Sequence, residues 1–245
     1  GMTGTHGVGS TATALSRRRL LQLAGAAGLT ALAGAVAAPV SSSSPPPQSA
    51  AGSLLCRDAW GARPPRPGGR PHTITRMTIH HTAVVLGDNA NITARLRQHQ
   101  RYHQDDKGWV DIAYHAGVDR DGNIFELRRT AIAGDTATNY DTTGHFLVVC
   151  EGNFDEEPIS EAQLNGAALA FAWATQEFGI TSSTLASHRQ VASGTSCPGA
   201  NLQAHVSSGD LRRRIDDMVT AGAVQLQPVC GPQAAEAVAA IEAGG

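Results

Sequence analysis

Apolar and polar positions in the middle of the chain predict two strands with a helix between them. Residues 77–80 alternate apolar and polar side chains and predict a strand that ends on His80. Residues 145–150 form a largely apolar run of strand length. Residues 91–104 repeat their apolar positions at helical spacing, which predicts a helix with one shared face made of Ile92, Leu96, His99 and His103.

A hairpin and a long helix are the other elements with clear boundary signals. Residues 111–118 and 123–127 predict two strands joined by a turn at Asp119-Arg-Asp-Gly122. Ser160 is a good N-cap for a helix that Gly179 ends. Shorter elements are predicted at residues 185–188, 200–205 and 209–220. Strands interleaved with helices in this way predict an α/β domain with a central mixed β-sheet flanked by helices.

The N-terminal region has the pattern of an export address. Residues 1–38 combine Ser16-Arg-Arg-Arg-Leu-Leu-Gln22, an apolar run and small residues near Ala38, which resembles a twin-arginine signal peptide. A membrane span is the alternative, but the apolar run at residues 23–36 has 14 residues. A span needs ~20 residues, so we expect a secreted or cell-envelope protein without a stable membrane anchor.

Composition sets the remaining boundaries. Residues 39–53 are rich in Ser and Pro and predict an extended linker. Residues 232–245 are Ala-rich and predict at most a marginal helix. We therefore expect the folded domain at residues 54–231, with Cys56 and Cys230 at its two ends. Export permits a disulfide between these cysteines, although the sequence alone does not show that the ends are close.

Charge and cysteine content narrow the function classes. The formal net charge of the chain is -2, so no basic field indicates a nucleic-acid partner. Four cysteines are too few for a disulfide-built scaffold. Cys150 follows the apolar run 146–149 and is expected as a buried thiol.

Three residues far apart in the sequence form a candidate metal site. His80 ends a predicted strand, and His188 and Cys197 lie nine residues apart near the end of the domain. Two imidazoles and one thiolate can hold Zn²⁺ and leave a fourth position for water, which is the arrangement of a catalytic zinc site. Such a site lowers the pKa of bound water to about 7 and polarises an amide carbonyl.

The flanks of these residues carry a family resemblance. The matching segments are Trp60-Gly-Ala-Arg63, Ile79-His-His-Thr82, Trp109-Val-Asp-Ile-Ala-Tyr-His115 with Asp121-Gly122, and Ser187-His-Arg-Gln-Val191 with Cys197-Pro-Gly199; Gly152-Asn-Phe154 is a weaker match. In this order they resemble the zinc-dependent N-acetylmuramoyl-L-alanine amidases, a family that includes peptidoglycan recognition proteins and phage T7-like lysozymes. The resemblance implies the fold of the recognition proteins and peptidoglycan as the partner.

The resemblance also implies roles for individual residues. His80, His188 and Cys197 correspond to the zinc ligands, and Tyr114 to a tyrosine whose hydroxyl lines the reaction site. Thr195 falls where the family has a lysine or threonine that contacts the reacting carbonyl. The spacing from His188 to Cys197 is one residue longer than is usual, so the assignment of Thr195 is less direct than that of the ligands.

Glu151 is a candidate taken from the sequence and not from the resemblance. It follows the predicted strand 145–150 and could carry a proton during catalysis. The alternative is a solvated carboxylate at the end of a strand. The family position is apolar in many members, so both interpretations stay open.

The other histidines have structural alternatives. His81 points away from His80 on a strand and is expected in the core or behind a ligand. His99 and His103 have a metal-binding i, i+4 spacing but share a face with apolar residues, which favours packing against the sheet. His115 alternates away from Tyr114 and is expected to be structural.

One segment departs from the family. Residues 133–139 place Asp135 where a histidine that touches the glycan–peptide stem is common, while Asn139 matches a family asparagine. The fine specificity for the stem peptide is therefore open.

The leading functional prediction is a secreted zinc amidase of bacterial origin, because animal recognition proteins lack a twin-arginine signal. It would cleave the amide between N-acetylmuramic acid and L-alanine, and we expect a monomer. A non-catalytic peptidoglycan-binding module is the first alternative; loss of the cysteine marks that class, and Cys197 is present. A thiol hydrolase using Cys197 and His188 is the second, and His80 in its matching context disfavours it.

Overall fold

The computed structural model describes residues 49–244. The export signal predicted at residues 1–38 lies outside the described residues, as does most of the linker predicted at residues 39–53. In the part of the chain that the structure describes, no helix has the length and apolar character needed to cross a membrane.

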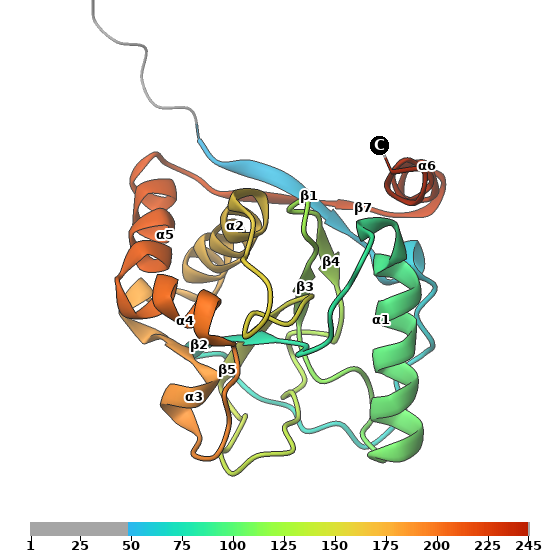
Figure 1. Ribbon diagram of the computed structural model, residues 1–245, viewed down its shortest axis with the longest axis horizontal. Helices are drawn as coiled ribbons and strands as arrows, with labels where there is room; N and C mark the ends of the chain where they lie inside the picture. The colour runs from blue at the N-terminus through green and yellow to red at the C-terminus, as the bar shows by residue number, and fades with distance from the viewer. Residues whose placement is uncertain (1–48, 245) are drawn as a thin grey trace, which may run out of the picture. The chain divides into compact units, whose positions relative to one another are not determined.

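The centre of the domain is one mixed β-sheet (Figure 1). Its strand order is β6-β2-β5-β3-β4-β1-β7. Only β3 and β4 pair antiparallel, as the predicted hairpin requires, and all other neighbours are parallel. The predicted mixed α/β fold is therefore confirmed. The strands are β1 (Ala51–Leu55), β2 (Arg76–His81), β3 (Ala116–Val118), β4 (Ile124–Glu126), β5 (His145–Cys150), β6 (Leu185–Ser187) and β7 (Gln225–Val229).

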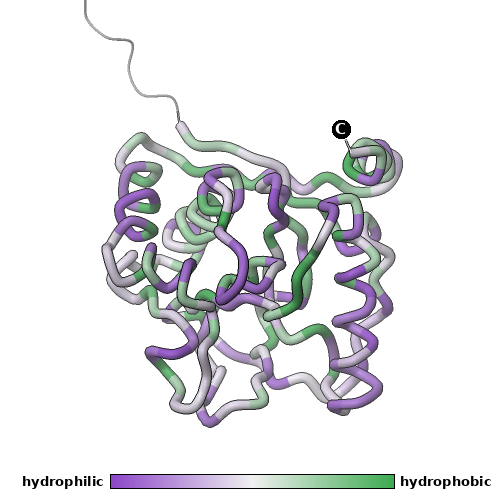
Figure 2. Tube along the Cα trace, in the orientation of Figure 1, coloured by the Kyte–Doolittle hydropathy of each residue, from purple (hydrophilic) through white to green (hydrophobic). Residues whose placement is uncertain are grey.

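Helices cover both faces of this sheet. The helices α2, α4 and α5 lie on one side and α1 on the other (Figure 1). Both α1 and α5 carry long hydrophilic stretches (Figure 2), as expected for helices with one face in water. The helices are α1 (Ile92–Arg101), α2 (Glu161–Phe178), α3 (His188–Val191), α4 (Ala200–Ser207), α5 (Asp210–Thr220) and α6 (Gly231–Glu242).

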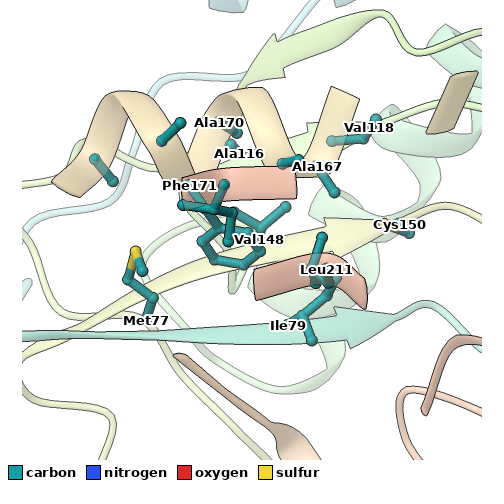
Figure 3. Packing of buried hydrophobic residues seen from close by; sticks show 14 of the residues in the cluster. Met77, Ile79, Ala116, Val118, Val148, Cys150, Ala167, Ala170, Phe171 and Leu211 are labelled. Atoms are coloured by element: carbon teal, nitrogen blue, oxygen red, sulfur yellow. The ribbon is translucent and has the colours of Figure 1, made fainter. Parts of the chain in front are cut away.

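The long helix α2 begins and ends where the sequence predicts. The side chain of Ser160 accepts a hydrogen bond from the N–H of Gln163, and Gly179 closes the helix in a left-handed conformation. Its small alanines let it lie close to the sheet. Figure 3 shows the Phe171 ring of α2 beside Val148 of β5, near Met77 and Ile79 of β2.

The α1 side holds a smaller apolar cluster. Its buried members come from several elements and are Leu55, Trp60, Ile92, Leu96, Ile112, Phe125, Leu127 and Val149. The predicted apolar face of α1 is confirmed, since Ile92 and Leu96 are buried in this cluster. The helix continues as a wider turn at Tyr102–Asp106.

The first predicted strand of the hairpin is shorter than expected. Residues 111–115 are irregular and only Ala116–Val118 forms a strand. At the start of this segment the buried carboxylate of Asp111 accepts hydrogen bonds from Arg57, from Gln100 and from the N–H of Ile112. Backbone bonds of residues 114 and 115 to Leu127, Arg128 and Leu147 hold the rest of the irregular segment beside the sheet.

The C-terminal segment forms more structure than its composition suggests. β7 adds a strand next to β1, and α6 is a helix of 12 residues where the sequence predicts at most a marginal one. Packing stabilises it: Ala234 is fully buried, and Glu242 accepts a hydrogen bond from Thr93 at 2.6 Å. The predicted disulfide between Cys56 and Cys230 is present and joins the start of the domain to the start of α6.

Candidate metal centre

His80 lies at the end of β2 on the α1 side of the sheet. Alternation along the strand directs Met77 and Ile79 into the core under α2, so His80 points to the opposite face. β5 runs parallel to β2 and places Val149, a member of the α1-side cluster, opposite His80. The imidazole is buried, with 2% of the residue exposed.

His188 reaches the same point from the neighbouring strand. β6 pairs in parallel with β2, with Ser187 opposite Ile79, so the two strands end at one edge of the sheet. α3 starts at the next residue, His188, and the side chain of Gln190 accepts a hydrogen bond from the N–H of Ser187 at 2.8 Å. This cap fixes the start of α3 and with it the histidine.

Cys197 is held by the loop that follows α3. Its carbonyl accepts from the N–H of Arg189 at 2.9 Å, and its own N–H donates to Oγ1 of Thr195 at 3.1 Å. The N–H of His81 points at Sγ from 3.4 Å. The thiol is therefore positioned by protein contacts alone.

These three side chains form a compact donor set. One ligand atom from each lies within 4.8 Å of the others, and all three residues are buried. Sγ of Cys197 lies 3.8 Å from Nδ1 of His80. Nδ1 of His188 is buried and has no hydrogen-bond partner among the described residues. An unpartnered imidazole nitrogen beside a second imidazole and a thiol fits Zn²⁺ with an open fourth position.

Burial sets the protonation of the donors. Desolvation, and then the neighbouring His188, hold the pKa of His80 well below its usual range. Burial lowers the pKa of His188 to about 4. Both imidazoles are therefore neutral near pH 7, the form that binds a metal. Burial raises the pKa of Cys197 to about 12 in the protein alone, so the thiol is a poor nucleophile without a cation beside it.

An open cavity of about 300 Å³ leads to the three donors. Its walls come from β2, the end of α1, residues 135–138 and the α3 loop. The lining residues are His80, His81, Ala83, Tyr102, His103, Lys107, Trp109, Ala113, Tyr114, Asp135, Thr136, Ala137, Thr138, His188, Thr195, Ser196 and Cys197. A ligand in this cavity would therefore meet the metal site at its base.

The fold and site geometry agree with a known family. A family model described as N-acetylmuramoyl-L-alanine amidase matches residues 70–200, more than half of the 245 residues. The chain belongs to this family. The match includes all three donor residues, and it confirms the resemblance carried by the sequence motifs.

Curated relatives of this amidase family include recognition proteins and amidases. The chain is 31% identical over 153 residues to peptidoglycan-recognition protein SC2 of Drosophila melanogaster. The aligned region covers 61% of this chain and 82% of that protein. It is 34% identical over 154 residues to an N-acetylmuramoyl-L-alanine amidase of Sus scrofa, covering 60% of this chain and 25% of that protein.

Solved structures show the same fold. Drosophila PGRP-LB superposes with a TM-score of 0.58 and 31% identity, covering 64% of this chain and 94% of that one. Human PGRP-IBETAC in complex with glycosamyl muramyl pentapeptide has a TM-score of 0.57 and 25% identity, covering 64% of this chain and 95% of that one. The relatives thus comprise both peptidoglycan amidases and peptidoglycan recognition proteins.

Tyr114 and Thr195 both line the cavity. The ring of Tyr114 is 5.2 Å from that of His80, and burial raises the pKa of the phenol above its usual value. Its hydroxyl therefore stays protonated at neutral pH. Thr195 also lines the cavity, and its Oγ1 accepts from the N–H of Cys197. The loop thus places a threonine hydroxyl beside Cys197.

Glu151 does not line the cavity. Its carboxylate accepts a hydrogen bond from Nε2 of His99 at 2.9 Å and lies 3.8 Å from the guanidinium of Arg95, both on α1. Only 3% of the residue is exposed, so the expectation of a solvated carboxylate is wrong. The geometry shows Glu151 joining β5 to α1.

The remaining histidines have structural partners, as the sequence favoured. Nδ1 of His81 accepts from the N–H of Phe154, and Nδ1 of His115 accepts from the N–H of Leu147. Nδ1 of His103 accepts from the N–H of Ala113, but His103 also lines the cavity. Helical spacing shows which residues share a face of the helix, but it does not show that His103 faces the cavity.

Two other contacts to the donors escape sequence analysis. Oγ1 of Thr138 lies 2.6 Å from Nε2 of His188, and the hydroxyl of Tyr140 lies 3.2 Å from Nε2 of His80. Both belong to the irregular segment between β4 and β5, which has no periodicity that could have indicated which residues face the site.

Asp135 and Asn139, the two residues compared with the family's stem-peptide contacts, lie in the same segment. Asp135 lines the cavity and its carboxylate pairs with Arg128 at 2.9 Å. Asn139 donates to the side chain of Ser193 at 3.2 Å and does not line the cavity. In this structure the asparagine joins two loops.

Proposed function

We propose that this protein is a zinc-dependent hydrolase of the cell wall. It cleaves the amide between the lactyl group of N-acetylmuramic acid and L-alanine in peptidoglycan, releasing stem peptides. The observation that carries the proposal is the buried His80–His188–Cys197 donor set at the base of an open cavity, in a chain of the amidase family.

The residues around the donor set have different roles in the proposed hydrolysis. A zinc ion bound here supplies a Lewis acid that polarises an amide carbonyl and water. Tyr114, neutral and next to His80, donates its hydroxyl proton as a hydrogen bond to the carbonyl oxygen as negative charge develops there. Thr195 lines the same wall and limits where that oxygen can sit. Glu151 is bonded to α1 and we assign it no catalytic step.

The observations favour catalysis over the two alternatives. A recognition module needs only the cavity, whereas this chain keeps the thiol of Cys197 and two neutral imidazoles facing one point. A thiol hydrolase needs an accessible thiolate, whereas Cys197 is buried and its pKa is raised to about 12. A thiol hydrolase needs one imidazole beside the thiol, whereas here a second imidazole, that of His80, lies 4.6 Å from the ring of His188 and 3.8 Å from Sγ of Cys197.

We also propose that the protein works as a monomer outside the bacterial cytoplasm, after twin-arginine export. The Cys56–Cys230 disulfide supports an oxidising compartment, where such bonds persist. Removal of residues 1–38 during export tests this: N-terminal sequencing of the exported protein should start near residue 39. Retention of the full N-terminus in the cytoplasm would contradict it.

The products of digested peptidoglycan test the activity. Purified peptidoglycan is incubated with the protein loaded with zinc, with the protein stripped by chelator, and with Cys197→Ser. We expect free stem peptides with an intact N-terminal alanine only from the zinc-loaded wild type. Cys150→Ala is the matched control, because Cys150 is a buried core thiol away from the cavity and its loss should leave the products unchanged.

The other outcomes separate the alternatives. Binding to the polymer without peptide release indicates a recognition module. Release that persists without zinc and stops with a thiol reagent indicates the thiol hydrolase.

A further inference from the structure

The segment between β4 and β5 places two hydroxyl groups against the two candidate imidazole ligands. Thr138 contacts His188, and Tyr140 contacts His80. Both contacts are made to Nε2, the ring nitrogen on the far side from Nδ1. Neither imidazole bonds to a carboxylate or a backbone carbonyl in the described part of the chain, so these hydroxyls are the groups that can orient the rings.

The contact to His188 is directional. Oγ1 of Thr138 lies 2.6 Å from Nε2 of His188 and 2.7 Å from Oγ1 of Thr136. Zn²⁺ binds a neutral imidazole, in which only one of the two ring nitrogens carries a proton. If that proton is on Nε2, it is donated to Thr138, whose own proton goes on to Thr136. Nδ1 is then left as a bare acceptor, which agrees with its being buried without a partner.

The contact to His80 leads to the same arrangement. The hydroxyl of Tyr140 lies 3.2 Å from Nε2 of His80, while Nδ1 of His80 lies 3.8 Å from Sγ of Cys197. The Tyr140 ring also stacks against His80 and tilts over His188, with centroids 6.4 and 5.3 Å away. The residue thus limits the rotation of both imidazoles as well as bonding to one.

We propose that Thr138 and Tyr140 are positioning residues that hold both imidazoles in the Nε2–H form and turn both Nδ1 atoms toward the metal. The proposal rests on the zinc site of the proposed function. Partners on the outer nitrogen of a metal-binding histidine fix its tautomer and ring orientation, and their loss typically weakens metal binding 10–100-fold. Neutral hydroxyls do this without adding negative charge, so the charge of the ion is offset by the thiolate alone.

Zinc affinity measured by competition with a chromophoric chelator tests the proposal without relying on activity. Thr138→Val and Tyr140→Phe remove one hydroxyl each, and we expect zinc dissociation constants about 10–100-fold above wild type for each. Thr138→Ser keeps the hydroxyl and should restore wild-type affinity. Thr143→Val is the matched control in the same segment, since its hydroxyl accepts from Arg70 at the surface and contacts neither imidazole.

A second measurement needs no variant. The imidazole ¹⁵N signals of the zinc-loaded wild type should show protonated Nε2 and metal-bound Nδ1 for both His80 and His188. Metal on Nε2 of either ring, or affinities of both hydroxyl variants within twofold of wild type, would overturn the proposal. Failure of the wild type to bind zinc would instead overturn the proposed function.

Discussion

The two faces of the sheet are built differently. Under α2 the contacts are apolar, with alanines and Phe171 packed on Val148, Met77 and Ile79 (Figure 3). On the α1 side the apolar cluster gives way, toward the end of β2, to buried histidines, Tyr114 and the thiol of Cys197. The α2 face stabilises the fold through apolar contacts. The α1 face instead buries polar side chains near the end of β2, which costs free energy unless they have partners.

Burying a polar atom without a hydrogen-bond partner costs free energy, and the few such atoms lie close together in the chain. Buried polar groups elsewhere on the α1 side are bonded; Asp111, for example, accepts from Arg57 and Gln100. In the described residues, three of the buried side-chain atoms without a partner are Oγ of Ser187, Nδ1 of His188 and Nε of Arg189. They are consecutive residues at the start of α3. Natural proteins leave few such atoms, and Nδ1 of His188 is the one of these three that belongs to the candidate donor set.

The largest expected change in stability comes from the apolar face. Phe171→Ala removes a fully buried ring between α2 and β5, and we expect a loss of about 3–5 kcal/mol in the free energy of unfolding. Zinc affinity of the folded variant should stay within twofold of wild type, because no donor contacts Phe171. Urea unfolding and chelator competition measure the two quantities. A strong loss of zinc affinity would show that the faces are coupled.

A substitution on the α1 side of the sheet should change activity and leave stability unchanged. Tyr114→Phe keeps the ring but removes the hydroxyl, and we expect the rate of peptide release to fall about 100–1000-fold, equivalent to about 3–4 kcal/mol. Zinc content and the unfolding midpoint should change little, since no hydrogen bond of the Tyr114 hydroxyl stabilises the fold among the described residues. Initial rates on purified peptidoglycan give the result, and an unchanged rate would remove Tyr114 from the mechanism.

The last prediction concerns pH and two buried histidines. Burial lowers the pKa of His115 and of His103 to about 3, below the usual value of 6.5. The unfolded chain therefore binds protons that the folded chain does not. Stability is fully present above pH 6.5 and falls as the pH drops toward 3, by up to about 1.4 kcal/mol per pH unit for each histidine.

Urea unfolding of zinc-free protein between pH 7.5 and 4.5 measures this slope. His115→Asn should lower stability at pH 7.5, because the contacts to Leu147 and Ile132 are weakened. It should also reduce the slope by about one proton. A slope equal to that of wild type would show that His115 does not contribute to the pH dependence.

The contrast between the faces also explains what the sequence could predict. Local patterns located α2, from the Ser160 cap to Gly179, and the strands β2 and β5, because alternation and caps are properties of neighbouring residues. They did not predict β7 or the length of α6, which depend on pairing with β1 and packing on residues far away in sequence. They also missed that residues 111–115 are irregular, with Asp111 buried and bonded to Arg57 and Gln100 far away in sequence.

The site shows the same division. The three donors could be named because their flanks resemble a family, and the structure brings them within 4.8 Å of one another. Thr138 and Tyr140 could not, since they lie in an irregular segment whose path is fixed by tertiary contacts. Glu151 illustrates the opposite error: its place at the end of β5 suggested solvent or catalysis, while His99 and Arg95 of α1 bury it.

X-ray absorption at the zinc edge identifies the ligand atoms of the bound ion. For the zinc-loaded wild type we expect one sulfur ligand at about 2.3 Å and nitrogen or oxygen ligands at about 2.0–2.1 Å, four in total. The sulfur contribution should vanish in Cys197→Ser and persist in Cys150→Ala. A zinc shell without sulfur in the wild type, or no bound zinc at all, would contradict the assignment of His80, His188 and Cys197 as the metal centre.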